Sequence, residues 1–327
     1  MRLIAHNEER FPKKIRAGKA GKQKVRFQYF EDCYKENAFL AEDIRQTVQN
    51  GVPLSEIAVL FRTNMQPRAL MEYMVSANLA FQTKDRIPDI YEHWIARDFF
   101  TYIRIAQGSD SRADFLSIMN RPKRYIGRDS LPDETVCFDE WVKLYEEQPW
   151  IAERIEKLWY DLKHLSRLSP YAAINYIRRG IGYDDYLAEY AEYRNANKED
   201  FYEVADEILA SAKGYRTFEE WFAHIEEYRQ ELKRLAQEKR RNQNAVTFAT
   251  LHSAKGLEFT KVYLIDVNEG VMPYKKAVLK QDVEEERRLF YVGMTRAKES
   301  LTICSVKKMR GKEVELSRFI KEAGKEP

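Results

Sequence analysis

Short runs of β-branched and aromatic residues recur along the chain and predict strands. Two of them, Val25–Phe30 and Ile57–Phe61, lie near its start. Three more lie near its end, at Val246–Leu251, Lys261–Val267 and Leu301–Val306, and such short apolar runs are typical of buried strands. Because helical patterns separate several of these runs, their order predicts a parallel α/β sheet, which binds ligands in the loops at its strand ends.

Two helical patterns complete this alternation. One covers Cys33–Asn50 and stops before a glycine, as helices commonly do. The other lies between the last two strands. We expect Asp282 to be its N-cap and Glu285 to complete a capping box, with Leu289 and Val292 on its apolar face.

Between residues 108 and 241 the pattern changes to helices alone. Apolar residues recur at helical spacing over 112–119, 134–147, 150–165, 171–179, 184–193, 198–212 and 218–240. We therefore expect one α/β domain, formed by 1–107 and 242–327, with an all-helical domain inserted at 108–241. The aromatic residues of the insertion fit a helical core better than a set of base-stacking side chains.

Composition adds few constraints. The 327 residues include 55 basic and 52 acidic ones, a net charge of +3, so any contact with nucleic acid must come from local patches. The three cysteines are scattered, which indicates neither a metal site nor a disulfide framework. There is no run of about 18 apolar residues. We therefore expect a cytoplasmic protein with no membrane partner and no metal ligands of its own.

The loop after the strand that ends at Leu251 contains several polar and charged residues close together. His252, Lys255 and Gly256 place an imidazole, an ammonium and a flexible backbone position within five residues, and Glu258 follows. Gly256 permits a positive φ or the close approach of a ligand to the main chain.

The helix that follows adds arginines to this loop. Arg287, Arg288 and Arg296 suit phosphate, because a guanidinium is a forked donor that keeps its charge when desolvated. The alternative is that these arginines and Lys255 are solvated surface charges of an ordinary α/β domain.

Four strings of residues carry a resemblance to a known family. TLHSAKGLEF (250–259) and EEERRLFYVGMTRAK (284–298) resemble the last two motifs of the UvrD/Rep/PcrA helicases, which are superfamily 1 DNA helicases. FRTNMQPRALMEYM (61–74) resembles a further motif that lines the nucleotide cleft, and NRPKRYIG (120–127) resembles a string in the family's helical insertion. The resemblance implies a RecA-like α/β domain with an inserted helical domain, and it covers nearly the whole chain.

The resemblance also implies roles for individual residues. ATP would bind with Mg²⁺, Arg296 would be the arginine finger on the γ-phosphate, and Arg62 would reach the same group beside it. Gly256 would shape the nucleotide-binding loop, and Glu258 would bind the ribose. The residues facing single-stranded DNA would be Asn64, Thr250, His252 and Lys255. For two of these a plainer alternative stays open, in which Arg62 forms a surface ion pair and Asn64 caps a helix.

The sequence lacks part of what such a motor needs. It contains no G-x-x-x-x-G-K-[ST] loop to cradle phosphates and no matching carboxylate pair for Mg²⁺. In the family these elements lie in an N-terminal RecA-like domain. We therefore expect the C-terminal half of a 3′–5′ helicase that acts on single-stranded DNA and on junctions with duplex. The missing domain would be its partner, and the chain alone would bind no ATP and be inactive.

Two other functions remain compatible with these residues. One is a non-enzymatic module that binds nucleic acid or docks a partner on the same fold. The other is the helicase part of a recombination nuclease complex, although no cluster of nuclease carboxylates is evident. Since fold alone does not separate these, the set Arg62, Glu258 and Arg296 is what favours a motor.

Overall fold

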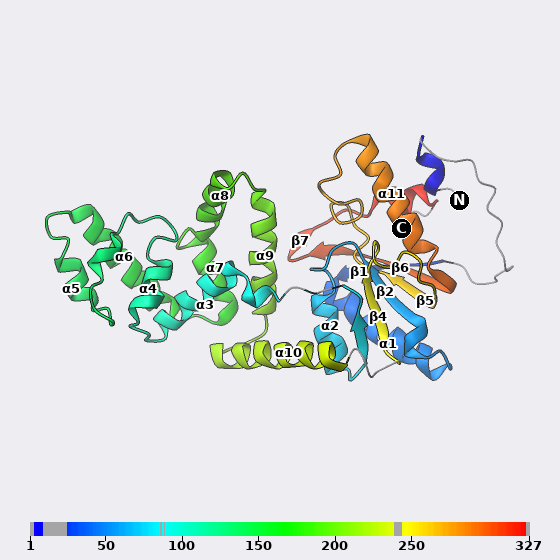
Figure 1. The fold of residues 1–327 in the computed structure, drawn as a ribbon, viewed down its shortest axis with the longest axis horizontal. Coiled ribbons are helices and arrows are strands. Elements are labelled where there is room, and N and C mark those ends of the chain that lie inside the picture. Colours follow the sequence, from blue (N-terminus) through cyan, green and yellow to red (C-terminus); the bar gives the residue numbers. More distant parts are fainter. Residues whose placement is uncertain (1–2, 9–24, 86, 88, 239–243, 325–327) are drawn as a thin grey trace. The chain divides into compact units, whose positions relative to one another are not determined.

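The computed structural model describes residues 3–8, 25–85, 87, 89–238 and 244–324. The chain divides into two compact units. Unit 1 combines residues 1–88 with 230–327, and unit 2 consists of residues 89–229. Unit 1 contains the sheet, and unit 2 consists mainly of helices (Figure 1).

Unit 1 is built on a seven-stranded sheet in the order β1-β6-β5-β2-β4-β3, with β7 paired to β6. All pairs are parallel except the short β6–β7 hairpin, which confirms the predicted α/β class. β2 lies beside β4, so the strands predicted from the two ends of the chain share one sheet. The strands are β1 (Arg26–Asp32), β2 (Ile57–Phe61), β3 (Phe81–Thr83), β4 (Val246–Thr250), β5 (Phe259–Leu264), β6 (Ala297–Met309) and β7 (Lys312–Glu313).

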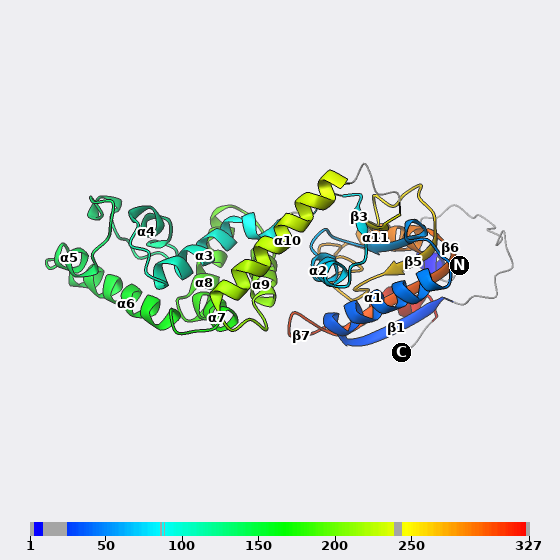
Figure 2. The same cartoon turned by 90° about the horizontal axis from the view of Figure 1, so that it is seen from below.

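Helices cover both faces of this sheet. Side chains alternate along each strand. In β2, Val59 therefore packs with α1 (Cys33–Gln49) and α2 (Arg68–Ser76), while Leu60 packs on the other face with α11 (Lys280–Met294) and α12 (Arg318–Glu322). Figure 1 shows α11 above the strands and α1 and α2 below them. In Figure 2, seen from below, α1 crosses in front of the sheet. The short 3-10 turns of unit 1 are η1 (Leu3–His6) and η2 (Leu54–Glu56).

Local signals placed α1 correctly and α11 only approximately. Asp32 caps α1 by accepting the Lys35 N–H at 2.9 Å. The predicted cap of α11 was wrong: the helix begins at Lys280, and Asp282 is its third residue. The Asp282 carboxylate accepts the Leu279 N–H at 3.3 Å, so it satisfies the helix end from inside the first turn.

Unit 2 is built from α3 (Trp94–Ala106), α4 (Arg112–Ile118), α5 (Phe138–Lys143), α6 (Pro149–Leu165), α7 (Pro170–Arg179), α8 (Tyr183–Tyr193), α9 (Lys198–Ser211) and most of α10 (Phe218–Glu238), with the turns η3 (Ile90–Glu92) and η4 (Arg128–Ser130). Its core holds Tyr102, Tyr183 and Trp221, which are all fully buried, whereas Trp150 is about half exposed.

The boundaries between the units differ from the expected 107/108 and 241/242. α3 belongs to unit 2 because its apolar stripe faces that unit's helices; Phe99, for example, packs edge-on against Tyr183 with 5.1 Å between ring centroids. The second boundary falls inside α10, and Leu232 of that helix packs into the core of unit 1. Periodicity alone does not show which core a helix joins.

Candidate functional site

The candidate site begins where two neighbouring strands end. β2 and β4 are parallel with Phe61 opposite Thr250, and the Leu251 N–H donates to the Phe61 carbonyl at 2.9 Å. Arg62 follows β2 directly, and the loop of residues 251–258, which we call the β4–β5 loop, follows β4. The fold therefore brings two predicted segments to one edge of the sheet, the edge at which open α/β folds bind ligands.

A carboxylate from α11 holds Arg62. Its guanidinium forms a fork with Glu286, with Nη2–Oε1 at 2.8 Å and Nε–Oε2 at 2.9 Å. The ring of Tyr274 lies 5.0 Å from the guanidinium carbon, and the Tyr274 N–H donates to the same carboxylate at 3.1 Å. The Arg62 side chain is only 20% exposed. The ion pair considered for Arg62 thus exists, but it is largely buried, so a phosphate would have to compete with Glu286.

The turn after Arg62 is fixed by a glutamine. Gln66 Oε1 accepts the N–H groups of Arg62 and Thr63, both at 2.8 Å. Asn64 is not a helix cap, because α2 begins after Pro67 and no side chain caps it. Instead, Asn64 Oδ1 is buried and has no hydrogen-bond partner in the described part of the chain. A buried acceptor of this kind is costly unless a donor reaches it.

The start of the β4–β5 loop is tied to an aspartate that follows β3. The Thr250 N–H donates to Asp85 Oδ2 at 2.8 Å, and the Ser253 hydroxyl donates to Asp85 Oδ1. The Ser253 N–H in turn donates to Thr250 Oγ1 at 3.2 Å. Thr250, a predicted DNA contact, therefore has its backbone donor occupied by an acidic side chain.

The polar residues in the rest of the loop are open to solvent, whereas Ala254 is buried. His252, Lys255, Gly256 and Glu258 are all exposed. Gly256 adopts φ +81°, which a glycine accommodates without strain. Neither Lys255 nor Glu258 makes a side-chain hydrogen bond or ion pair to any residue that the structure describes. Both charges are thus available to a ligand.

The pKa of His252 depends on its burial and on the charges around this edge of the sheet. Partial burial lowers its pKa below the ordinary value, and the positive charges of Arg62 and Lys255 lower it further, against smaller opposing effects of Glu286 and Asp85. Its imidazole is therefore neutral at pH 7, with one nitrogen as donor and the other as acceptor.

Arg296 lies just beyond the end of α11 and makes hydrogen bonds to neutral oxygens. Nη1 donates to the Leu257 carbonyl, Nε to the Val292 carbonyl and Nη2 to Thr295 Oγ1, each at 3.0 Å. Its own carbonyl accepts the Phe259 N–H at 2.9 Å. No carboxylate among the described residues forms an ion pair with it. The guanidinium is positioned by the β4–β5 loop but its charge is not neutralised.

A glycine lets α11 lie close to this loop. A Cβ on Gly293 would come within 2.3 Å of Leu251 Cδ2. Since Gly293 precedes Arg296 by three residues, its lack of a side chain fixes the distance between the arginine and the loop. Any larger residue would push the helix end and the loop apart.

The two predicted catalytic arginines are held at different places. Arg62 is held by Glu286, and the helix between Glu286 and its last residue, Met294, rises about 12 Å before Arg296 is reached. Arg296 instead contacts the loop near Phe259, the first residue of β5. For both side chains to reach one phosphate group, at least one would have to leave its present partners.

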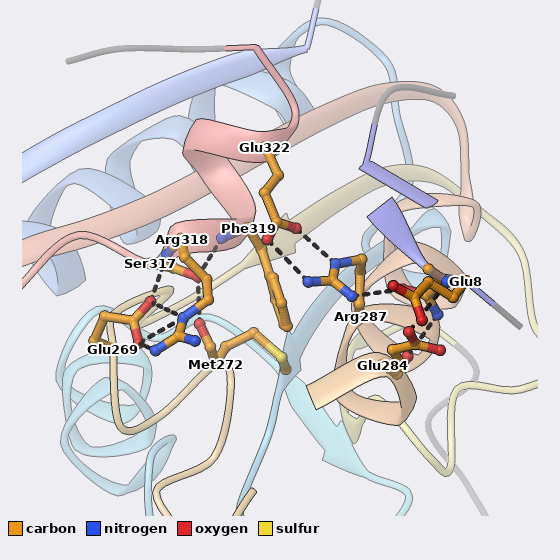
Figure 3. A network of polar contacts seen from close by, with 10 residues as sticks. Glu8, Glu269, Met272, Glu284, Arg287, Ser317, Arg318, Phe319 and Glu322 are labelled. Atoms are coloured by element: carbon orange, nitrogen blue, oxygen red, sulfur yellow. Dashed lines mark hydrogen bonds and ion pairs between the residues drawn. The ribbon is translucent and has the colours of Figure 1, made fainter. Parts of the chain in front are cut away.

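Arg287 and Arg288 do not face a ligand in the way the sequence suggested. Arg287 is buried, donates to both oxygens of Glu322 at 2.6 and 2.9 Å, and donates to Asn7 Oδ1 at 2.6 Å. Phe319 lies beside it, with the ring centroid 5.3 Å from the guanidinium carbon (Figure 3). Arg288 pairs with Glu285 one turn away at the surface. Arg287 thus connects α11 to the N-terminal segment at Asn7 and to the C-terminal helix α12 at Glu322.

Sequence reasoning missed three residues of the site. Glu286 lies in the string that drew attention to its neighbouring arginines, so its position directly before Arg287 and Arg288 was a usable signal. Gln66 likewise lies in a quoted string, FRTNMQPRALMEYM, whereas Asp85 gave no such signal, because single polar residues after short strands are common. Their roles depend on which strands become neighbours.

Two further observations describe what the residues could hold. No group of three or more His, Cys, Asp or Glu is placed to hold a metal within the described ranges. In the same part of the chain, no helix is long and apolar enough to cross a membrane. The exposed groups of the loop include the Lys255 ammonium, the His252 imidazole and the Glu258 carboxylate, and this set suits phosphate and sugar groups.

Comparison with known proteins gives a consistent result. The model of the UvrD-like helicase C-terminal domain matches residues 1–133 and 143–308. The chain is 26% identical over 332 residues to a protein named putative ATP-dependent DNA helicase YjcD of Bacillus subtilis (strain 168), covering 97% of the chain and 43% of that protein.

Two other relatives are similar over a comparable share. The ATP-dependent DNA helicase PcrA of Staphylococcus epidermidis is 29% identical over 98% of the chain and 46% of its own length. The ATP-dependent DNA helicase Rep of Escherichia coli (strain K12) is 27% identical over 98% of the chain and 51% of its own length. The chain thus spans about half the length of the curated relatives it matches.

Proposed function

The chain belongs to the UvrD-like helicase C-terminal domain family, and from this premise we propose that it forms the C-terminal part of an ATP-dependent DNA helicase. The observation that carries the proposal is Arg296. Its guanidinium is fixed by hydrogen bonds to neutral oxygens and has no carboxylate partner in the described chain. A positioned but uncompensated guanidinium is the group that stabilises charge on a transferring phosphoryl group.

On the nucleotide side, four residues of this chain contribute. Arg296 and Arg62 bind phosphate oxygens, the second after release from Glu286. Glu258 is an exposed carboxylate that accepts hydrogen bonds from a ribose, and Gly256 supplies the turn that presents it. ATP with Mg²⁺ supplies the phosphoryl group and its counter-charge when bound.

On the nucleic-acid side, the β4–β5 loop carries the contacts. Lys255 binds a DNA phosphate, and neutral His252 and Thr250 donate hydrogen bonds to the same strand. The buried oxygen of Asn64 accepts a donor from the ligand side. Because the charge of Arg62 lowers the pKa of His252, an anion bound at Arg62 raises the pKa of His252. The substrates proposed are single-stranded DNA and its junctions with duplex, with movement in the 3′–5′ direction.

The remaining elements of the motor come from another domain. This sequence has no phosphate-cradling G-x-x-x-x-G-K-[ST] loop. We infer that an N-terminal RecA-like domain completes the nucleotide site, so that closing and opening of the cleft between the two domains moves DNA. The chain alone therefore hydrolyses no ATP.

A DNA titration tests the nucleic-acid half of this proposal. The isolated chain should bind an oligothymidylate with micromolar or weaker affinity, falling as salt rises. Lys255→Ala should weaken binding and reduce the slope of log K against log salt by about 0.7, the value for one phosphate contact on a single strand. Lys35→Ala, which removes the same charge from the exposed surface of α1, is the matched control and should change little. Salt-insensitive or strongly sequence-specific binding would contradict the proposal.

A further inference from the structure

An acidic side chain accepts hydrogen bonds from two donors at the start of the β4–β5 loop. Asp85 Oδ2 accepts the Thr250 N–H at 2.8 Å, and Asp85 Oδ1 accepts the Ser253 hydroxyl. Each carboxylate oxygen therefore takes one donor, and the two donors converge on a single anionic group. Their position at the end of β4 is the ligand-binding edge of a parallel sheet.

These donors are arranged independently of the aspartate. The Ser253 N–H donates to Thr250 Oγ1 at 3.2 Å, and the two hydroxyl oxygens lie 3.1 Å apart. The turn thus holds the Thr250 N–H and the Ser253 hydroxyl side by side through its own bonds. A backbone N–H and a serine hydroxyl are among the commonest donors to nucleic-acid phosphates.

The charges around the loop include one carboxylate and one ammonium that are not paired within the described chain. Glu286 is engaged by Arg62, whereas Asp85 forms no ion pair with any cation that the structure describes. Lys255, on the same loop, likewise has no carboxylate partner in the described chain. Removing the Asp85 charge would leave a backbone N–H, a hydroxyl and an ammonium on one short loop.

We propose that the Thr250 N–H and the Ser253 hydroxyl form a phosphate-binding site for single-stranded nucleic acid, and that Asp85 occupies it as an internal phosphate mimic. Nucleic acid binds this loop only by displacing the carboxylate. The apparent affinity is therefore the intrinsic affinity multiplied by the fraction of molecules in which Asp85 has left the site. The inference rests on the proposed function, because it assumes that DNA reaches the β4–β5 loop.

Asp85→Asn is the decisive variant, since asparagine keeps an acceptor oxygen and the size of the side chain but loses the charge. Binding to an oligothymidylate at low salt should tighten about fourfold or more, as expected from removing the repulsion between one carboxylate and one phosphate charge about 5 Å apart in water. The slope of log K against log salt should steepen by about 0.7 as one more phosphate contact forms. Glu42→Gln, the same charge change on the exposed side of α1, should do neither.

The opposite role for Asp85 predicts the opposite result. If the carboxylate only braces the loop, Asp85→Asn and Asp85→Ala weaken binding or leave it unchanged, and the salt slope does not steepen; either result overturns the inference. Thermal unfolding of each variant shows whether the loop's host domain is intact. If Lys255→Ala weakens binding while Asp85→Asn fails to strengthen it, the inference alone fails. If none of the proteins binds the oligonucleotide, the inference and the DNA half of the proposed function fail together.

Discussion

Helix α11 and the residues just after it carry two kinds of arginine, and they belong to two different regions of the molecule. Arg287 lies in what we call the anchor network, with Asn7, Glu322 and Phe319, where its charge is buried and compensated (Figure 3). Arg296 lies at the β4–β5 loop, where neutral oxygens orient its guanidinium without compensating it. The same residue type thus occurs with and without a counter-charge within ten positions.

The difference separates folding from function. A buried ion pair is costly to break, because removing one partner leaves the other charged and desolvated. An oriented cation with no acid partner contributes little to the fold, and its charge becomes favourable when an anion arrives. Sequence motifs mark both kinds of arginine equally, and only their partners distinguish them.

The largest expected effect is on turnover. In the complete helicase, Arg296→Ala should lower DNA-stimulated ATP hydrolysis by about 10³-fold or more, the range found for arginine fingers in other phosphoryl-transfer enzymes. The variant loses three hydrogen bonds to neutral acceptors that water can partly replace, so we expect a loss of only about 1–2 kcal/mol of unfolding free energy. Steady-state ATPase rates and thermal unfolding measure the two quantities. If hydrolysis stayed near normal, the claim that Arg296 serves catalysis whereas Arg287 serves folding would be contradicted.

The next effect falls on stability and concerns the anchor network. Arg287→Ala should lower the unfolding free energy by about 3–5 kcal/mol, because it leaves the Glu322 carboxylate partly buried without its partner. The matched control is Arg288→Ala, whose pair with Glu285 is exposed and should cost less than about 1 kcal/mol. Denaturant unfolding of both variants gives the comparison. Equal losses would mean that burial does not distinguish the two arginines.

The architecture was largely predictable from the chain, since the apolar period and the order of the elements indicated a mainly parallel sheet, with the strands from both ends of the chain in it, and a run of helices between them. The direct pairing of β2 with β4 was not predicted. The two ends of α10 could not be assigned to separate cores, because its pattern is the same throughout. For the candidate site, the sequence indicated the arginines and the residues of the β4–β5 loop but not the acidic side chains that hold them. Glu286 and Asp85 decide whether Arg62 and Thr250 are available, and both reach the site from elements distant in sequence. Such pairings arise from strand order, which local periodicity does not encode.

A smaller effect should appear in the pH dependence of stability. Glu36 is buried against Asp266, and burial first, then the neighbouring negative charge, raises its pKa well above the ordinary value. A raised pKa in the folded state means that folding binds a proton, so the stabilisation is complete below about pH 4 and is lost as pH rises through the folded-state pKa. Glu36→Gln should therefore lose less stability than the wild type as pH rises from about 5 to 9. Parallel pH profiles of the two proteins would show that Glu36 is not the linked group.

The most direct test of the central claim is the rate of DNA-stimulated ATP hydrolysis by Arg296→Lys in the complete helicase. Lysine keeps the positive charge but presents a single ammonium in place of the planar fork. We predict a rate close to that of Arg296→Ala, with an unfolding midpoint close to the wild type. A rate near the wild type would show that a positive charge without the fork suffices, and would contradict the proposed role of the Arg296 guanidinium as an arginine finger.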